Sequence, residues 1–188
     1  MSNFTDFFPA AGGGGGGIPK YQDFITSGTF TPTQALIDAG GRVSYFVVAG
    51  GQQGTNASTQ PSLGGSGGEV EYGYMTLTST TGCLVTIGAG GASLNAVGGN
   101  SSAIFSSAGG TDVIASGGAG DATGRNFGAK WYSGRGYSTA FSGVGNYGKG
   151  GGSSYDGGGV NVPLPNSGGG SRANAQAGSG FVRITWFE

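Results

Sequence analysis

Hydrophobic and polar residues alternate with a period of two along several short stretches of the chain. In EVEYGYMTLT, residues 69–78, the side chains of Val70, Tyr72 and Tyr74 lie on one face, and those of the residues between them lie on the other. Successive side chains of a β-strand point to opposite faces, so this pattern predicts a strand. The closing stretch GFVRITWFE, residues 180–188, alternates in the same way. We expect it to pair back into the sheet, because its apolar face must be buried.

Other stretches predict the rest of an all-β fold. RVSYFVVAGG, residues 42–51, is apolar on both faces toward its end, which is typical of a strand in the middle of a sheet. In TPTQALIDAGG, Thr33 can cap and Gly40 can end a single helical turn. Further short strands, bounded by glycine or serine turns, are predicted at residues 21–31, 84–91, 101–107 and 111–118. Together these patterns predict an antiparallel β-sandwich, jelly-roll-like, with a long glycine-rich loop region.

Glycine supplies 46 of the 188 residues, and a glycine-rich stretch at residues 118–179 separates the last predicted strand from the others. The Gly-X-Y period of collagen is absent. The formal net charge is only −1 and aromatic residues make up 11% of the chain, which favours packing over disorder. We therefore expect one β domain over residues 18–188, in which residues 118–179 are a glycine-rich loop insertion.

Glycine-rich segments can be ordered as polyglycine-II strands, which pack side by side because no Cβ atoms hold them apart. Ordering the backbone costs about 1–2 kcal/mol per residue. Hydrogen bonds between strands and buried rings are candidates to offset that cost. The insertion contains these aromatic residues: Phe127, Trp131, Tyr132, Tyr137, Phe141, Tyr147 and Tyr155.

The same rings are candidates for binding, because a mixture of Tyr, Ser, Gly and Asn is typical of recognition loops. In KWYSGRGY, residues 130–137, three rings stand beside Lys130 and Arg135. Such rings can stack on sugars, while the cations can meet phosphates or carboxylates. The alternative is that the rings only hold glycine strands together. The receptor-binding candidates are Trp131, Tyr132, Arg135, Tyr137, Tyr147 and Tyr155.

The first segment, residues 1–17, reads as an attachment peptide followed by a glycine linker. Phe4, Phe7, Phe8 and Pro9 form an apolar cluster, and the run Gly12–Gly17 follows them. Polyglycine is flexible, so the cluster can insert into another protein at the end of a tether. The alternative is a frayed terminus with incidental aromatic residues.

Several classes of chemistry are disfavoured by composition. The chain has no histidine and one cysteine, Cys83, which we expect to pack as a small apolar residue. Its glycines lack the spacing of phosphate-binding loops, and its cationic bias is too small to favour nucleic-acid binding. We expect no enzymatic activity, cofactor or metal site. We also expect neither a signal peptide nor a membrane-spanning run, and therefore synthesis in a cytoplasm.

The order of these motifs resembles the glycine-rich tail and fibre proteins of tailed bacteriophages. The resemblance lies in FITSGTFT, then VVAGG, then VTIGAGG, then glycine-rich loops, then the closing GFVRITWFE, and it covers about residues 22–187. The chain departs from the usual pattern after GTFT, where PTQALIDAGG follows, and its glycine runs are interrupted by Ser, Asn and aromatic residues.

This resemblance implies an all-β scaffold with a structural or receptor-binding role on the virion, as a homo-oligomer, with a trimer expected from the symmetry of fibres. The partners it implies are other virion proteins, held through the N-terminal peptide, and a host-surface glycan or outer-membrane component. The alternative is a capsid or tail decoration protein without a receptor role. A secreted enzyme or lectin is a third alternative, which the lack of histidine and of a signal peptide disfavours.

Overall fold

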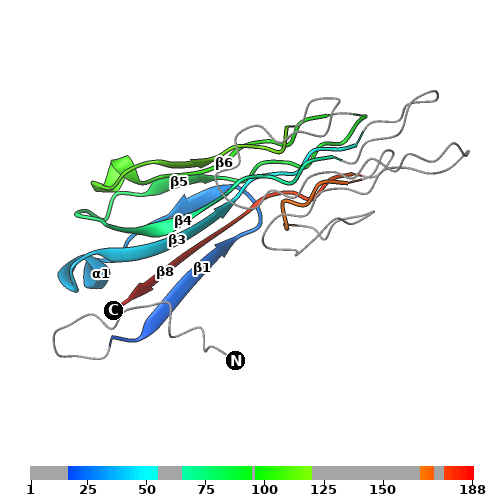
Figure 1. Cartoon of the computed structure of the whole chain (residues 1–188). Helices are drawn as coiled ribbons and strands as arrows, with labels where there is room; N and C mark the ends of the chain where they lie inside the picture. The colour runs from blue at the N-terminus through cyan, green and yellow to red at the C-terminus, as the bar shows by residue number, and fades with distance from the viewer. Residues whose placement is uncertain (1–16, 55–64, 95, 120–165, 172–175) are drawn as a thin grey trace, which may run out of the picture.

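The computed structural model describes residues 17–54, 65–94, 96–119, 166–171 and 176–188, and within them the fold is nearly all β (Figure 1). The predicted antiparallel β-sandwich is confirmed, since the strands form two four-stranded antiparallel sheets. Sheet A has the order β1 (Pro19–Phe24), β8 (Phe181–Phe187), β3 (Arg42–Val48) and β4 (Val70–Thr76). Sheet B has the order β2 (Gly28–Phe30), β5 (Cys83–Thr86), β6 (Ser101–Ile104) and β7 (Val113–Ala115).

The predicted central and closing strands take the places that their patterns indicate. β3 lies between β8 and β4, and its last residues, Val47 and Val48, are both buried. β8 pairs antiparallel with β1 on one side and with β3 on the other, so that Val182 lies opposite Val47 and Phe24. The closing strand therefore inserts into the middle of sheet A, as its alternation requires.

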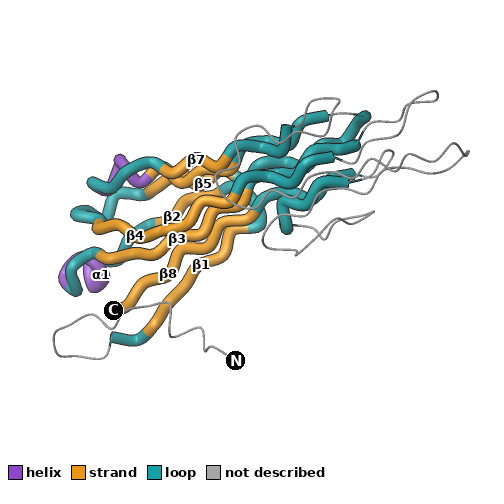
Figure 2. Tube along the Cα trace, viewed as in Figure 1, coloured by secondary structure: helices purple, strands orange, loops and turns teal. Residues whose placement is uncertain are grey.

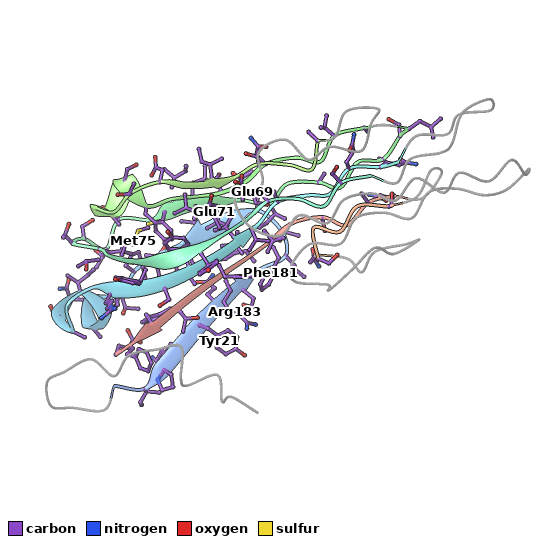
Figure 3. The ribbon with its side chains drawn as sticks, in the orientation of Figure 1. Tyr21, Glu69, Glu71, Met75, Phe181 and Arg183 are labelled. Atoms are coloured by element: carbon purple, nitrogen blue, oxygen red, sulfur yellow. The ribbon has the colours of Figure 1, made fainter. Side chains whose placement is uncertain are left out.

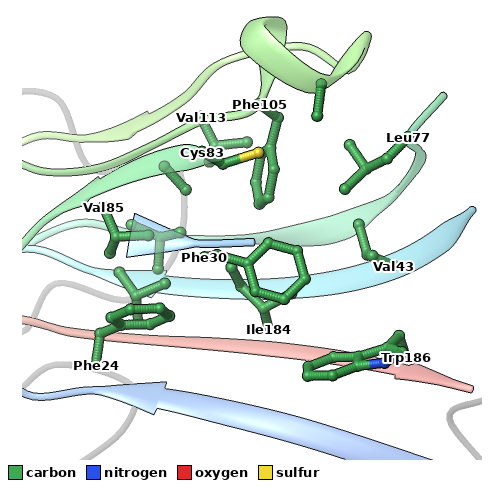
Figure 4. Close-up of a cluster of buried hydrophobic side chains, with 14 of the residues drawn as sticks. Phe24, Phe30, Val43, Leu77, Cys83, Val85, Phe105, Val113, Ile184 and Trp186 are labelled. Atoms are coloured by element: carbon green, nitrogen blue, oxygen red, sulfur yellow. The ribbon is translucent and has the colours of Figure 1, made fainter. Parts of the chain in front are cut away.

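The core fills the space between the two sheets (Figure 4). Phe30 of β2 packs edge-on against Trp186 of β8, with ring centroids 5.3 Å apart, and Phe105 is fully buried against the same cluster. Cys83 is buried among these side chains, as expected for a small apolar residue. Phe105 begins a 3-10 turn, η2 (Phe105–Ala108), which follows β6 directly.

The predicted helical turn is confirmed as α1 (Gln34–Asp38). The hydroxyl oxygen of Thr33 accepts a hydrogen bond from the Leu36 amide at 3.1 Å, so Thr33 is the N-cap. The helix ends at Asp38 with Ala39 as its C-cap, and Gly40 and Gly41 follow with φ angles of +100° and +68°. Residues other than glycine rarely adopt such angles, which explains why the helix stops there.

Beyond the strands, seven extended segments lie side by side and continue both sheets in the same direction (Figure 2). We call them the glycine bundle. They are residues 49–54, 65–69, 88–91, 96–99, 116–118, 166–171 and 176–180.

Segment 49–54, which follows β3, is the centre of the glycine bundle. Its consecutive amides donate in three different directions: Ala49 to segment 65–69, Gly50 to segment 96–99 and Gly51 to segment 176–180. The first two directions recur three residues later, because Gln52 donates to Ser66 and Gln53 to Ala96. A period of three residues is that of the polyglycine-II helix.

The carbonyl groups of the central segment complete its contacts. Gly50 accepts a hydrogen bond from Gly118 at 2.8 Å, Gly51 from Gly91 at 2.9 Å and Gln52 from Ser171 at 3.1 Å. Donors and acceptors together therefore link segment 49–54 to all six other segments. In a β-sheet a strand bonds to two neighbours in one plane, whereas here the bonds radiate around the chain, as between packed rods.

Glycine is required in the bundle by close approach of the backbones. A Cβ atom on Gly51 would lie 2.2 Å from the carbonyl oxygen of Gly169, and one on Gly98 would lie 1.9 Å from that of Gly50. Real Cβ atoms do not approach oxygen so closely. Neither residue has a positive φ, so their backbone angles alone do not demand glycine. The constraint is the distance between neighbouring segments.

The predicted strand 84–91 is shorter in the structure, because β5 ends at Thr86 and residues 88–91 belong to the glycine bundle. The aromatic residues that were expected to help hold glycine strands together lie within residues 127–155, outside the described part of the chain, so that expectation stays a prediction. The seven described segments contain no aromatic residue and contact each other through their backbones.

We predict that Gly51→Ala lowers the free energy of unfolding by at least about 1–3 kcal/mol, because the added methyl group forces neighbouring segments apart. The matched control is Gly28→Ala in β2, where a Cβ atom would meet the Phe24 ring at an ordinary 3.4 Å. That control should change the same quantity by less than about 1 kcal/mol. Denaturant unfolding of the three proteins measures the difference, and equal stability of both variants would contradict the close packing of the bundle.

Candidate binding surface

The residues singled out in the sequence for binding lie outside the described part of the chain. This holds for the receptor-binding candidates Trp131, Tyr132, Arg135, Tyr137, Tyr147 and Tyr155 and for the attachment candidates Phe4, Phe7, Phe8 and Pro9. The structure neither brings these side chains together nor separates them, and both assignments stay predictions.

The structure does show where each of these stretches joins the fold. Residues 1–16 join at Gly17, beside Phe187 and Glu188, at the end of the sandwich away from the glycine bundle (Figure 1). The stretch 120–165 joins at Ala119, directly after bundle segment 116–118, and at Asn166, the first residue of another bundle segment. The predicted attachment peptide is therefore connected to the end of the sandwich away from the glycine bundle, and the predicted recognition loop is connected to the bundle itself.

Among the described residues, aromatic and arginine side chains gather on the outer face of sheet A. We call this set the aromatic–arginine surface: Tyr21, Arg42, Tyr72, Tyr74 and Arg183. The three tyrosines are 67%, 55% and 69% exposed in chain order. Their neighbours along each strand, such as Val43 and Ile184, face the core, so strand alternation places the set on the outer face.

Arg183 fixes one side of this surface. Its guanidinium donates two hydrogen bonds to the Asp23 carboxylate, at 2.6 and 2.7 Å, across the β1–β8 pair. The guanidinium carbon also lies 5.1 Å from the centre of the Tyr21 ring and 5.7 Å from that of Phe181 (Figure 3). A paired guanidinium over two rings holds all three side chains in a defined arrangement.

Arg42 occupies the other side of the surface. Its guanidinium carbon lies 4.6 Å from the centre of the Tyr74 ring, which comes from the neighbouring strand β4. A guanidinium stacked on a ring keeps its N–H groups at the edge, where they can donate to a carboxylate or phosphate. The surface therefore combines ring area for stacking with a cation for an anionic group.

A small apolar cluster supports the surface near the bundle. Val48, Val70 and Phe181 are buried on this outer face, and Phe46 packs against them. Bundle segment 166–171 covers part of the cluster, because a Cβ atom on Gly168 would lie 2.5 Å from a methyl carbon of Val48. The aromatic–arginine surface and the bundle are thus joined by direct packing.

Two titratable side chains of the described residues have raised pKa values. Burial raises the pKa of the Cys83 thiol, which keeps it protonated and unreactive. Burial, with a smaller contribution from Glu71, likewise raises the pKa of Tyr45. Within the described ranges, no three His, Cys, Asp or Glu side chains are placed to hold a metal ion. No helix in that same part of the chain is long and apolar enough to cross a membrane.

Comparison with known proteins assigns the chain to no family. No model of a protein family matches the chain, and no curated protein matches it significantly.

The sequence interpretation missed the aromatic–arginine surface, although part of its signal was present. Alternation placed Tyr72 and Tyr74 on one face of a strand, but it did not say which face the second sheet would cover. Tyr21 and Arg183 come from the two ends of the domain, and only the β1–β8 register brings them together.

Near the C-terminus, Glu188 holds three elements together. Its carboxylate is paired with Lys20 of β1 and accepts a hydrogen bond from the hydroxyl of Thr33, the N-cap of α1. Its main chain pairs with Ile18 in both directions, at 2.7 and 3.3 Å. The hydrogen bonds from Lys20 and Thr33 lower the pKa of the Glu188 carboxyl below its usual value.

We predict that Glu188→Gln lowers the melting temperature at pH 7 but has little effect at strongly acidic pH. Because the folded-state pKa is lowered, the ionised carboxylate stabilises the fold above the usual glutamate pKa of about 4.3. This stabilisation is lost as the pH falls through the lowered value. Thermal unfolding of both proteins between pH 7 and pH 2 measures the gap, and a gap that does not change with pH would refute the role of the charge.

Proposed function

We propose that the protein is a non-enzymatic structural protein of a tailed-phage virion, namely a tail or fibre component that contacts the host surface. The observation that carries the proposal is that the two candidate binding segments join different parts of the molecule. The Phe-rich segment 1–16 joins at one end, and the aromatic-rich stretch 120–165 joins at the glycine bundle toward the other. A protein that is anchored at one end and presents binding residues at the other needs such a layout.

The glycine bundle supports the proposal as a rigid mount. Each described segment is fixed by hydrogen bonds to neighbouring backbones, as for Gly98, which donates to Gly118, and Gly178, which donates to Gly169. Loops that extend from such a mount begin and end at defined positions, so less entropy is lost when they bind. Receptor-binding loops on a rigid scaffold follow the general rule that loops carry function.

The chemistry of the candidate residues favours a glycan or another polar component of the host surface. Trp131, Tyr132 and Tyr137 offer ring faces for sugar stacking, and Arg135 offers paired donors for a carboxylate or phosphate. The proposal includes anchoring to another virion protein through Phe4, Phe7, Phe8 and Pro9. It also includes a homo-oligomeric state on the particle.

We predict that particles carrying the double variant Trp131→Ala/Tyr132→Ala adsorb to host cells at least tenfold more slowly than wild type, because stacking area is lost. An aromatic pair is worth roughly 0.5–1.5 kcal/mol beyond its buried area, and this sets the scale for the two stacking rings removed here. The matched comparison is Tyr72→Ala/Tyr74→Ala, which removes two rings from the outer face of sheet A and should leave adsorption unchanged. Adsorption rate constants of particles with normal protein content measure the effect.

Three outcomes would change or contradict the proposal. Slow adsorption in the Tyr72/Tyr74 variant alone would move the receptor contact to the aromatic–arginine surface. Normal adsorption in both variants, together with gold-labelled antibody over the head or collar instead of the tail or fibre tip, would favour a decoration protein. Absence of the label from all particles would contradict a virion role.

A further inference from the structure

β1 is an edge strand of sheet A, and β8 is its only strand partner among the described residues. The two strands are antiparallel and stay in register over the whole of β1. Ile18 and Glu188 extend the pairing by one step, since the main-chain N–H of each donates to the carbonyl group of the other. Residues 1–16 join directly before this point, at Gly17. β8 is therefore the strand that connects the predicted attachment peptide to the rest of sheet A.

The reciprocal hydrogen bonds of Ile18 and Glu188 set the alternation along the β1–β8 pair. In an antiparallel pair, hydrogen-bonded positions alternate with positions that are not hydrogen-bonded. Pro19, which has no N–H, falls at a position of the second kind, where the main-chain N–H would point to solvent. Asp23 falls at another such position, where opposite side chains are closest, and its partner there is Arg183. The proline thus costs the pair no hydrogen bond.

Side chains tie the two strands together near both ends of the pair. Near the attachment peptide, Lys20 of β1 forms an ion pair with Glu188. Near the glycine bundle, the Asp23 carboxylate accepts two hydrogen bonds from Arg183, at 2.6 and 2.7 Å. Phe24, the last residue of β1, is buried in the core. A slip of one residue would separate both ion pairs and turn Phe24 to the outer face, so the pair resists sliding along the strands.

The other end of β8 is fastened to the end of stretch 120–165. Asn166, where that stretch rejoins the described chain, donates its main-chain N–H to the Ser179 hydroxyl oxygen at 3.1 Å. The same hydroxyl donates to the side-chain oxygen of Asn166 at 2.8 Å, and the Gly168 amide donates to the Ser179 carbonyl group at 2.8 Å. Ser179 immediately precedes Gly180, and β8 follows. Tension on the end of the stretch therefore passes through Ser179 to β8.

We propose that the β1–β8 pair is a mechanical clamp, which carries tension between the particle and the host surface. The direction of the tension rests on the proposed function, in which residues 1–16 are anchored and stretch 120–165 binds. Because the strands are antiparallel, each is then pulled from its own N-terminal end, and these ends lie at opposite ends of the pair (Figure 1). All steps of the pairing carry the tension at the same time and must break together, which is a shear geometry.

The same pair is weak in another direction. A Cβ atom on Gly17 would lie 3.3 Å from the main-chain nitrogen of Glu188, so the two ends of the pair leave the fold side by side. Tension between these ends opens the pair one step at a time, beginning with the hydrogen bonds between Ile18 and Glu188. The clamp therefore resists force along its strands and yields to force that peels them apart.

The test is single-molecule force spectroscopy of the full chain, pulled in these two directions. For shear, one handle precedes Met1 and the other is attached at Gln176→Cys, an exposed position in the bundle segment that leads into β8. For peeling, the handles precede Met1 and follow Glu188. Cys83 is buried and does not compete for the handle. At equal loading rate, we expect a rupture force at least about twofold higher in shear, because forced unfolding follows the barrier and all steps break together.

The variant Asp23→Asn measures the contribution of the ion pair. It keeps the size of the side chain but weakens its bonds to Arg183, so the rupture force in shear should fall. Peeling begins at the other end of β1, so its onset force should stay at the wild-type value. The matched control is Asp38→Asn in α1, whose carboxylate accepts a hydrogen bond from Gln34 and which should change neither force. Equal rupture forces in shear for the two variants would contradict the role of the ion pair.

A second measurement identifies the strands that separate first. Tyr21 and Thr185 are opposite each other at a position that is not hydrogen-bonded, where side chains are close enough for a disulfide. Oxidised Tyr21→Cys/Thr185→Cys should lose the first extension step in shear, and reduction should restore it. Equal wild-type rupture forces in both directions, or a first step that persists in the oxidised variant, would overturn the proposal. Neither measurement involves particles or host cells, so failure here is distinguishable from failure of the proposed function.

Discussion

The structure depends on the close approach of backbones around segment 49–54. Hydrogen bonds radiate from this segment to six neighbours, and a single methyl group on Gly50 would lie 2.1 Å from the carbonyl oxygen of Ala89. Each net hydrogen bond contributes only about 0.5–1.5 kcal/mol, which is similar to the cost of ordering one residue. No segment is therefore stable by itself, and the bundle forms only when all its members are held in place together.

The sandwich supplies that placement. Segment 49–54 continues β3, segment 65–69 precedes β4, and segment 176–180 leads into β8, so the order of sheet A already sets three members side by side. Sheet B supplies others in the same way through β5, β6 and β7. At the junction, the Glu69 carboxylate accepts a hydrogen bond from the Ser116 amide at 2.7 Å, and the Glu69 amide donates to the Ser116 carbonyl. This reciprocal pair ties sheet A to sheet B where the strands end and the bundle begins.

Much of the sandwich was predictable from the sequence, because alternation and capping are local signals. The burial of Val47 and Val48, the cap at Thr33 and the insertion of the closing strand all follow from short stretches of residues. The bundle was harder to locate, because its period of three residues leaves no fixed sequence pattern: Gln52, Gln53 and Ser66 occupy positions among the glycines and are buried there. The aromatic–arginine surface was missed because it depends on register between distant strands, and the candidate residues of stretch 120–165 lie outside the described part of the chain.

Hydrogen exchange of backbone amides distinguishes a rigid glycine bundle from ordinary glycine loops. Glycine amides in ordinary loops exchange quickly, whereas those of Gly51, Gly98 and Gly178 donate to the carbonyl groups of Gly178, Gly118 and Gly169. We expect these amides to be protected nearly as strongly as those of β3 and to open together with the sandwich. Strong protection in β3 combined with fast exchange at these three glycines would show that the bundle does not hold the fold together.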